Sequence, residues 1–150
     1  QLLFLMLIES ILWSSVLLII MLFSQKLFLS FSTTSNLFEM ISISIGAGIW
    51  EELTFRLFGI SAITFIFYTL FQYKKSYSTL IALIISSLIF SMFHYLGVYG
   101  DIFTWESYSY RSIAGLILGT LYITRGFGIS VYTHIFYDIA LVSLNMQNQS

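Results

Sequence analysis

Residues 46–71 read GAGIWEELTFRLFGISAITFIFYTLF and place Glu51, Glu52 and Arg56 inside a stretch that is otherwise apolar enough for a lipid-buried helix. An ionisable side chain at the centre of a membrane helix costs about 2.5 to 3.5 kcal/mol on an insertion scale. A cluster of them therefore needs partners, water or a function. We expect this cluster to mark a functional site within a membrane helix.

The composition of the whole chain is typical of a membrane protein. Of its 150 residues, 58% are hydrophobic and 9% are charged, whereas soluble domains average about 45–50% apolar and about 25% charged residues. The net charge of −1 and the scattered basic residues provide no basic patch, so nucleic acid is not an expected partner. The chain contains no cysteine, which excludes disulfides, a thiolate nucleophile and cysteine zinc ligands.

Apolar runs separated by short polar segments predict an all-α fold, a polytopic transmembrane helix bundle with about five to six helical segments. A first span is expected at 2–23, a connection rich in serine and threonine at 24–36, and one long helix at 37–73. At 1.5 Å per residue that helix would be about 55 Å long, so it must tilt strongly, leave the bilayer or break. Gly46 and Gly48 are the expected break.

The second half of the chain predicts shorter segments. The expected elements are a turn at 72–78, a span at 79–97, a mixed aromatic and acidic loop at 98–110, a short helix at 111–124, a turn at 124–130 and a final helix at 129–146. We expect a single domain, in which residues 1–36 form an N-terminal transmembrane helix and connection and residues 37–150 form the helical core that carries the site. Because the chain begins with glutamine, sequence is expected to be missing at its ends.

Both histidines and most of the charged residues in the middle of expected helices fall into three ordered motifs. These motifs are Glu51-Glu52-x-x-x-Arg56, Phe90-x-x-x-His94 and His134-x-x-x-Asp138, and they contain both histidines of the chain. Helical spacing places Glu52 and Arg56 one turn apart on one face, where they can pair. Glu51 is rotated by about 100° from Glu52 and is left free for chemistry. His134 and Asp138 likewise share a face, and Phe90 can pack against an imidazole ring.

The ordered set EELTFR, FSMFH and HIFYD resembles the CAAX protease and bacteriocin-processing (CPBP) family, also called the Abi family of intramembrane proteases, over about residues 45–146. The resemblance implies an endopeptidase in a helical membrane core that hydrolyses the peptide bond with a glutamate-activated water. It implies that Glu51 is the general base and that His94 binds and polarises the water. It further implies that Glu52 and Arg56 organise the site.

The resemblance also assigns stabilisation of the oxyanion to His134 and the residue at position 138. An oxyanion needs hydrogen-bond donors at about 2.7 to 3.1 Å, and an ionised Asp138 cannot donate. Asp138 is therefore expected to orient His134 or a neighbouring histidine, or to act as a protonated donor. Simple upright spans place His134 far from Glu51, so we expect residues 111–124 to be tilted or recessed, or the 98–110 loop to dip inward.

Several functions remain open from the residues. Glu51, Glu52, His94, His134 and Asp138 supply enough donors for zinc, but nothing resembles HExxH and a glutamate mechanism needs no metal, so no cofactor is the favoured expectation. The alternative class is a non-enzymatic membrane scaffold, immunity or regulatory protein with the same fold, and a transporter fragment ranks last. Expected partners are the lipid bilayer and a peptide or protein substrate that carries or lacks a lipid. The resemblance suggests CAAX-like, bacteriocin-leader or signalling-peptide substrates and a bacterial cell membrane.

Overall fold

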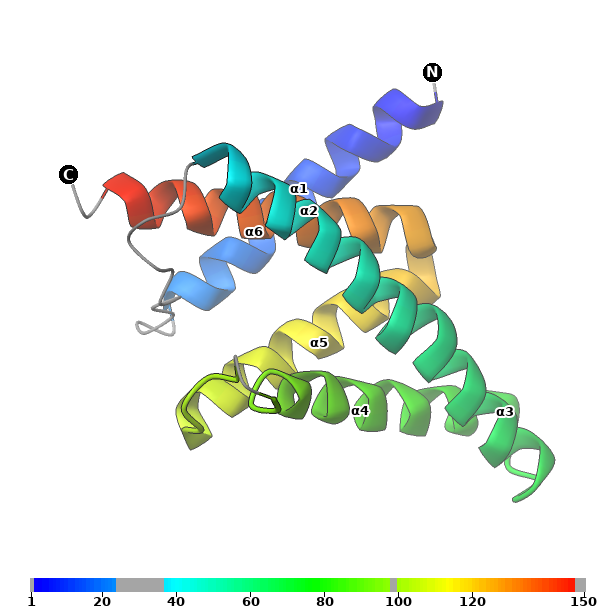
Figure 1. The fold of residues 1–150 in the computed structure, drawn as a ribbon. Helices are drawn as coiled ribbons and strands as arrows, with labels where there is room; N and C mark the ends of the chain where they lie inside the picture. Colours follow the sequence, from blue (N-terminus) through cyan, green and yellow to red (C-terminus); the bar gives the residue numbers. More distant parts are fainter. Residues whose placement is uncertain (1, 24–36, 98–99, 148–150) are drawn as a thin grey trace.

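The computed structural model describes residues 2–23, 37–97 and 100–147, and all its regular elements are helical (Figure 1). This confirms the predicted all-α fold. The predicted connection at 24–36 lies outside the described residues, as do residues 98–99 of the predicted loop. The elements are α1 (Leu2–Phe23), α2 (Leu37–Glu51), the π-helix η1 (Glu52–Ile60), α3 (Ser61–Thr69), α4 (Lys75–Phe93), α5 (Trp105–Arg125) and α6 (Phe127–Gln147).

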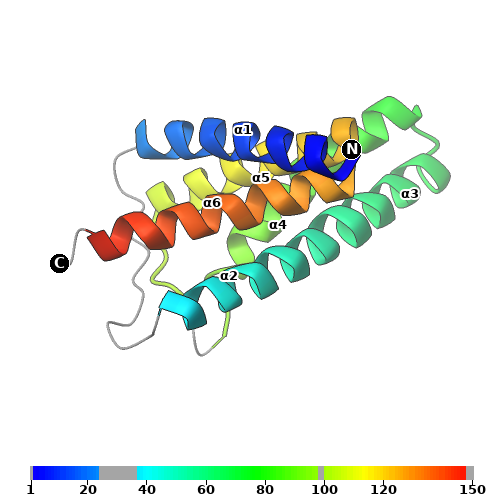
Figure 2. The ribbon, with the colours of Figure 1, turned by 90° about the horizontal axis from the view of Figure 1, so that it is seen from above.

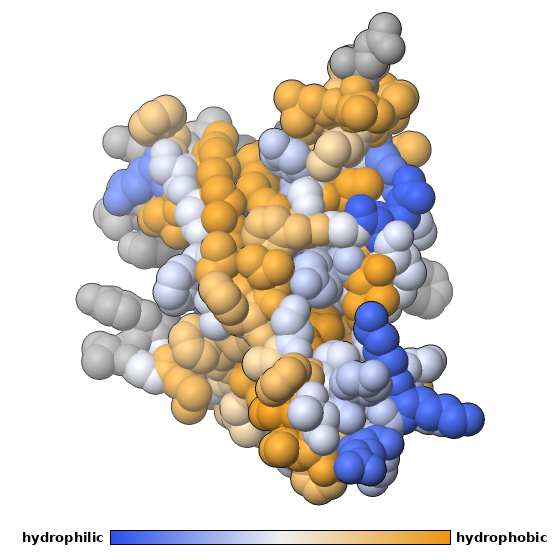
Figure 3. All heavy atoms as spheres, turned by 90° about the vertical axis from the view of Figure 1, so that its right-hand side faces the viewer, coloured by the Kyte–Doolittle hydropathy of each residue, from blue (hydrophilic) through white to orange (hydrophobic). Residues whose placement is uncertain are grey.

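Length and composition make α1, α4 and α6 suitable for crossing a membrane, over Leu2–Met21, Lys75–Phe93 and Phe127–Leu144. Large apolar side chains lie on the outside of the bundle, where Figure 3 shows them as a broad band over one face. Apolar side chains that would be costly in water are suited to a lipid surface. The structure thus agrees with the predicted transmembrane helix bundle.

Helix α6 occupies the middle of the bundle. It packs against α1, α2 and α5, while α4 packs against α5 and α3. Figure 2 shows α2, η1 and α3 as one long rod that runs obliquely past α6 toward the start of α4. An apolar cluster closes the junction of α1, α5 and α6, and it consists of Leu17, Met21, Ala114, Leu118, Tyr137 and Leu141.

The predicted break at Gly46 and Gly48 was wrong. Helix α2 continues through both glycines to Glu51, and the irregular part of the long rod is the π-helix that follows. A Cβ atom at position 48 would lie 2.9 Å from Cγ1 of Ile135. Gly48 therefore lets α6 pack closely against α2 and does not kink the helix. From Glu52 onward, the residues of the first polar motif form the rarer π-helix with i→i+5 hydrogen bonds, which is frequent at functional sites.

Helix α5 begins at Trp105, six residues before the predicted start at 111. The hydroxyl of Thr104 caps it by accepting a hydrogen bond of 3.1 Å from the backbone N–H of Ser107. Its 21 residues give about 31 Å of helix, enough to cross a hydrocarbon core. The predicted short helix was therefore wrong, and so was the long turn after it, because Gly126 alone (φ +94°) separates α5 from α6.

Two glycines let α5 approach α4 closely. A Cβ atom at Gly115 would lie 3.1 Å from Cδ1 of Phe90 and 3.2 Å from Cα of Ser87, and one at Gly119 would collide with the side chain of Leu83. Small residues four apart allow such close contact between membrane helices. This contact holds Phe90 on α4 against α5 and so positions the middle motif.

Candidate active site

The three motifs meet at one place in the fold. Glu51 ends α2, Glu52 and Arg56 lie on η1, His94 directly follows α4, and His134 and Asp138 lie on α6. The carboxylate of Glu51 lies 3.9 Å from Nε2 of His94 and 3.7 Å from Nε2 of His134. The structure therefore brings all six predicted site residues together. Upright spans would place His134 and Glu51 at different depths. Helix α5 is longer and begins earlier than predicted, and the α2–η1–α3 rod runs obliquely (Figure 2), so the two residues meet at one depth.

Glu52 is the fully buried centre of the site. One carboxylate oxygen, Oε1, lies 3.3 Å from Nε of Arg56 and 2.9 Å from Nδ1 of His134. The other oxygen, Oε2, accepts a hydrogen bond from the hydroxyl of Ser130, which also lies 3.0 Å from the carbonyl oxygen of Leu118. Glu52 and Arg56 are 0% and 1% exposed, so each offsets the burial of the other's charge.

Ser130 is a site residue that the motifs did not reveal. It is buried and lies on α6 one turn before His134, and both side chains contact Glu52. The four-residue spacing to His134 could have suggested a shared face. A serine in a membrane helix commonly bonds its own backbone, however, so the spacing alone did not single it out.

Phe90 connects Arg56 to both histidines. The guanidinium of Arg56 lies 4.2 Å from the centre of the Phe90 ring, a cation–π distance. The same ring meets His94 and His134 edge to face, at centroid distances of 5.0 Å and 6.1 Å. This confirms the prediction that Phe90 packs against an imidazole ring.

Glu51 and His94 face each other across a gap that suits a water molecule. Nδ1 of His94 lies 3.0 Å from the carbonyl oxygen of Phe90, and because a carbonyl only accepts, Nδ1 carries the proton in this bond. Nε2 of a neutral His94 is then an acceptor that faces Glu51 at 3.9 Å. That separation is too long for a direct hydrogen bond, but a water can donate one hydrogen to each group.

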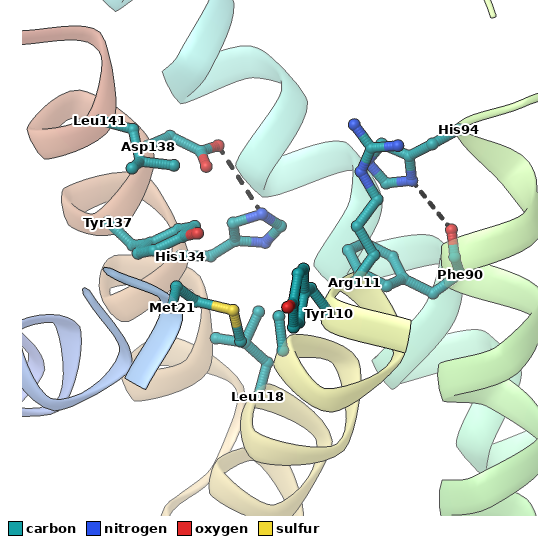
Figure 4. Close-up of a pocket in the computed structure, with 11 residues that line it drawn as sticks. Met21, Phe90, His94, Tyr110, Arg111, Leu118, His134, Tyr137, Asp138 and Leu141 are labelled. Atoms are coloured by element: carbon teal, nitrogen blue, oxygen red, sulfur yellow. Dashed lines mark hydrogen bonds and ion pairs between the residues drawn. The ribbon is translucent and has the colours of Figure 1, made fainter. Parts of the chain in front are cut away.

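His134 contacts three carboxylates through its two nitrogens. Nδ1 donates to Glu52, whereas Nε2 lies 3.6 Å from Oδ2 of Asp138 and 3.7 Å from Oε2 of Glu51. Figure 4 shows the His134 ring next to the Asp138 carboxylate, with a dashed line for this ion pair. Glu52 makes the only hydrogen bond to this ring within the described residues, so Glu52 orients it more directly than Asp138 does.

A cavity of about 70 Å³ opens beside these groups (Figure 4). Its polar wall comprises His94, Arg111, His134 and Asp138. A buried water needs roughly 10–15 Å³ of such space, so the cavity has room for a few groups of that size. Arg111 belongs to none of the three motifs, and only the packing of α5 brings it to this wall.

The zinc alternative concerns the same histidine and carboxylate side chains. Zinc requires its histidine and carboxylate ligands about 2.0 to 2.2 Å from one point. In the part of the chain that the structure describes, no group of three or more His, Cys, Asp or Glu side chains is placed to hold a metal ion.

A family match covers the residues that build this site. The sequence model described as Rce1-like, type II CAAX prenyl endopeptidase Rce1-like, matches residues 33–140, more than half of the chain. The matched segment contains all three polar motifs. No curated protein and no solved structure matches the chain.

Proposed function

Because the chain belongs to the Rce1-like family of type II CAAX prenyl endopeptidases, which are membrane-embedded proteases, we propose that it is itself an intramembrane endopeptidase in which Glu51 activates water. The observation that carries this proposal is the convergence of two imidazole Nε2 atoms on the Glu51 carboxylate, at 3.7 and 3.9 Å. Glu51 is the general base in this proposal, because its side chain is 18% exposed, whereas Glu52 is 0% exposed and bound to Arg56, His134 and Ser130.

The proposed reaction begins with a water held between Glu51 and His94. Glu51 takes one proton from the water as its oxygen attacks the carbonyl carbon of the substrate. The resulting tetrahedral intermediate carries negative charge on the former carbonyl oxygen. The C–N bond then breaks as Glu51 returns the proton to the leaving nitrogen, which yields a carboxylic acid and an amine, and the acid then gives its proton to the amine.

His134 is proposed to donate to the oxyanion in its imidazolium form. In that form both ring nitrogens donate, so Nδ1 can bond Glu52 while Nε2 is directed at the reacting centre. The carboxylates of Glu51, Glu52 and Asp138 around its ring supply the negative charge that such a cation needs. Glu52 and Arg56 are proposed to position His134 rather than to touch the substrate.

The family description supports a CAAX-type, lipid-modified protein as the first substrate to test. Bacteriocin leader peptides and signalling peptides are further candidate substrates, and a bacterial cell membrane is the proposed location. The apolar outer faces of α1, α4 and α6 are consistent with a substrate that approaches within the bilayer.

The test is mass spectrometry of cleavage products from prenylated CAAX, non-prenylated CAAX and leader-type peptides, incubated with the full chain in liposomes. We expect Glu51→Gln to lower the rate by about 10²- to 10⁴-fold, the range that a general base contributes. Glu39→Gln, at an exposed position of the same helix α2, should cleave like the wild type.

A parallel reaction with a chelator tests the zinc alternative, and loss of cleavage on chelation would support it. Equal product yields from wild type and Glu51→Gln would show that Glu51 is not the general base. Absence of any cleavage, with folded protein, would favour the non-enzymatic scaffold or immunity alternative.

A further inference from the structure

Arg111 is a cation on the cavity wall that the reaction described above does not use. It lies on α5, and its Nη2 donates to Oδ2 of Asp101 at 2.5 Å. Its Cζ lies 5.3 Å from the centre of the Tyr95 ring. Nη1 is buried and has no hydrogen-bond partner among the described residues. The guanidinium is thus held on two sides while one donor edge is unused.

The proposed reaction lacks a second donor for the oxyanion. His134 can supply one N–H from Nε2, but Asp138, the other residue that the resemblance assigns to this role, carries a carboxylate. An ionised carboxylate only accepts hydrogen bonds and would repel the developing negative charge. A fixed cation on the same cavity wall meets this need.

Arg111 lines the same cavity as His94 and His134. Figure 4 shows its side chain beside His94, across the cavity from Asp138. A guanidinium stays protonated at all relevant pH values, and a rotation about its last flexible bonds would turn Nη1 into the cavity that the side chain already lines.

We propose that Arg111 donates a hydrogen bond from Nη1 to the carbonyl oxygen of the scissile peptide bond and stabilises the oxyanion. This inference rests on the proposed endopeptidase function. The proton remains on Arg111 throughout, and no bond to the arginine forms or breaks. Asp101 and Tyr95 hold the guanidinium at the cavity wall before substrate binds, and the rotation that turns Nη1 toward the substrate is the reorganisation that the interaction requires.

The test compares kcat and KM of Arg111→Gln with those of the wild type on the best peptide from the cleavage screen. Removal of one oxyanion donor is expected to lower kcat by about 10²- to 10³-fold, with KM nearly unchanged. Arg125→Gln is the matched control, because Arg125 pairs with Glu9 outside the cavity and should keep wild-type kcat. Arg111→Lys keeps the positive charge but lacks the planar guanidinium with its two NH₂ groups, and it should give an intermediate kcat.

A rescue experiment separates donation from a structural role. In the Arg111→Gln background, Asp138→Asn replaces an acceptor with an amide that can donate, so kcat should partly recover. Thermal unfolding of each variant in detergent monitors the fold. If Arg111→Gln does not fold, kcat of Arg111→Lys is compared with kcat of the double variant Arg111→Lys, Asp138→Asn in the same way.

Wild-type kcat in folded Arg111→Gln or Arg111→Lys, or a change confined to KM, would overturn the inference while the endopeptidase function stands. Absence of recovery in the double variant would overturn it too. A wild type without Glu51-dependent cleavage would overturn the proposed function and the Arg111 inference together.

Discussion

Glu51 and Glu52 are neighbours in sequence but occupy two different halves of the site. Glu52 belongs to a closed half, in which it is 0% exposed and contacts Arg56, His134 and Ser130. Glu51 belongs to a more open half, is 18% exposed and has the imidazole nitrogens of His134 and His94 at 3.7 and 3.9 Å. The difference indicates that two identical side chains have separate tasks, one in support and one in chemistry.

The closed half should carry the larger share of stability. Arg56→Ala leaves Glu52 as a buried carboxylate without its guanidinium, and breaking one side of a buried pair costs about 3–5 kcal/mol. We expect the free energy of unfolding, measured by denaturant titration in detergent, to fall by about that amount, together with cleavage. Glu51→Gln should leave unfolding nearly unchanged. Equal losses in the two variants would contradict the division into halves.

Ser130 tests the closed half more gently. Ser130→Ala removes one hydrogen bond to a charged group, which is worth about 1.5–3 kcal/mol, while Glu52 keeps Arg56 and His134. We expect lower stability and a reduced cleavage rate in the same assays. Ser143→Ala on the same helix is the control, because Ser143 is exposed and, within the described residues, its hydroxyl bonds the backbone oxygen of Ile139. If the two serine variants behave alike, Ser130 has no special role in holding Glu52.

The smallest expected effect comes from the close packing of α5 against α4 beside Phe90. A Cβ at Gly115 would contact Phe90 and the backbone of Ser87, so Gly115→Ala should cost about 1 kcal/mol through overpacking and lower cleavage by displacing Phe90. Gly46→Ala is the matched control, since nothing lies within 4 Å of that Cβ. It should stabilise its helix by about 0.5–1 kcal/mol. A neutral Gly115→Ala variant would show that Phe90 does not transmit packing to the histidines.

Local spacing predicted much of the site. The pairing of Glu52 with Arg56 and the packing of Phe90 on an imidazole both follow from a separation of four residues on a helix, and the structure contains both contacts. The first span was also predicted with the bounds that the structure has, Leu2–Phe23. These features depend on residues within one helix, so the order of residues is enough to find them.

Other predictions failed where a local signal was ambiguous. Thr104 caps α5, but the aromatic and acidic residues that follow it predicted a loop. Gly46 and Gly48 predicted a break, although a glycine in a membrane helix also serves close packing, as Gly48 does against α6. Ser130 and Arg111 were missed because each contacts site residues on other helices, and no spacing within one segment records such a contact.

The order of the residues by itself determined that this protein is a helical membrane protein with three polar motifs, because hydropathy and helical periodicity are local properties. Only the tertiary structure decided that these motifs share one depth, that Glu52 is enclosed by Arg56 and Ser130, and that Arg111 lines the cavity. The physical reason is that crossing angles and translations of helices arise from side-chain packing between distant segments, above all where glycines let the backbones approach.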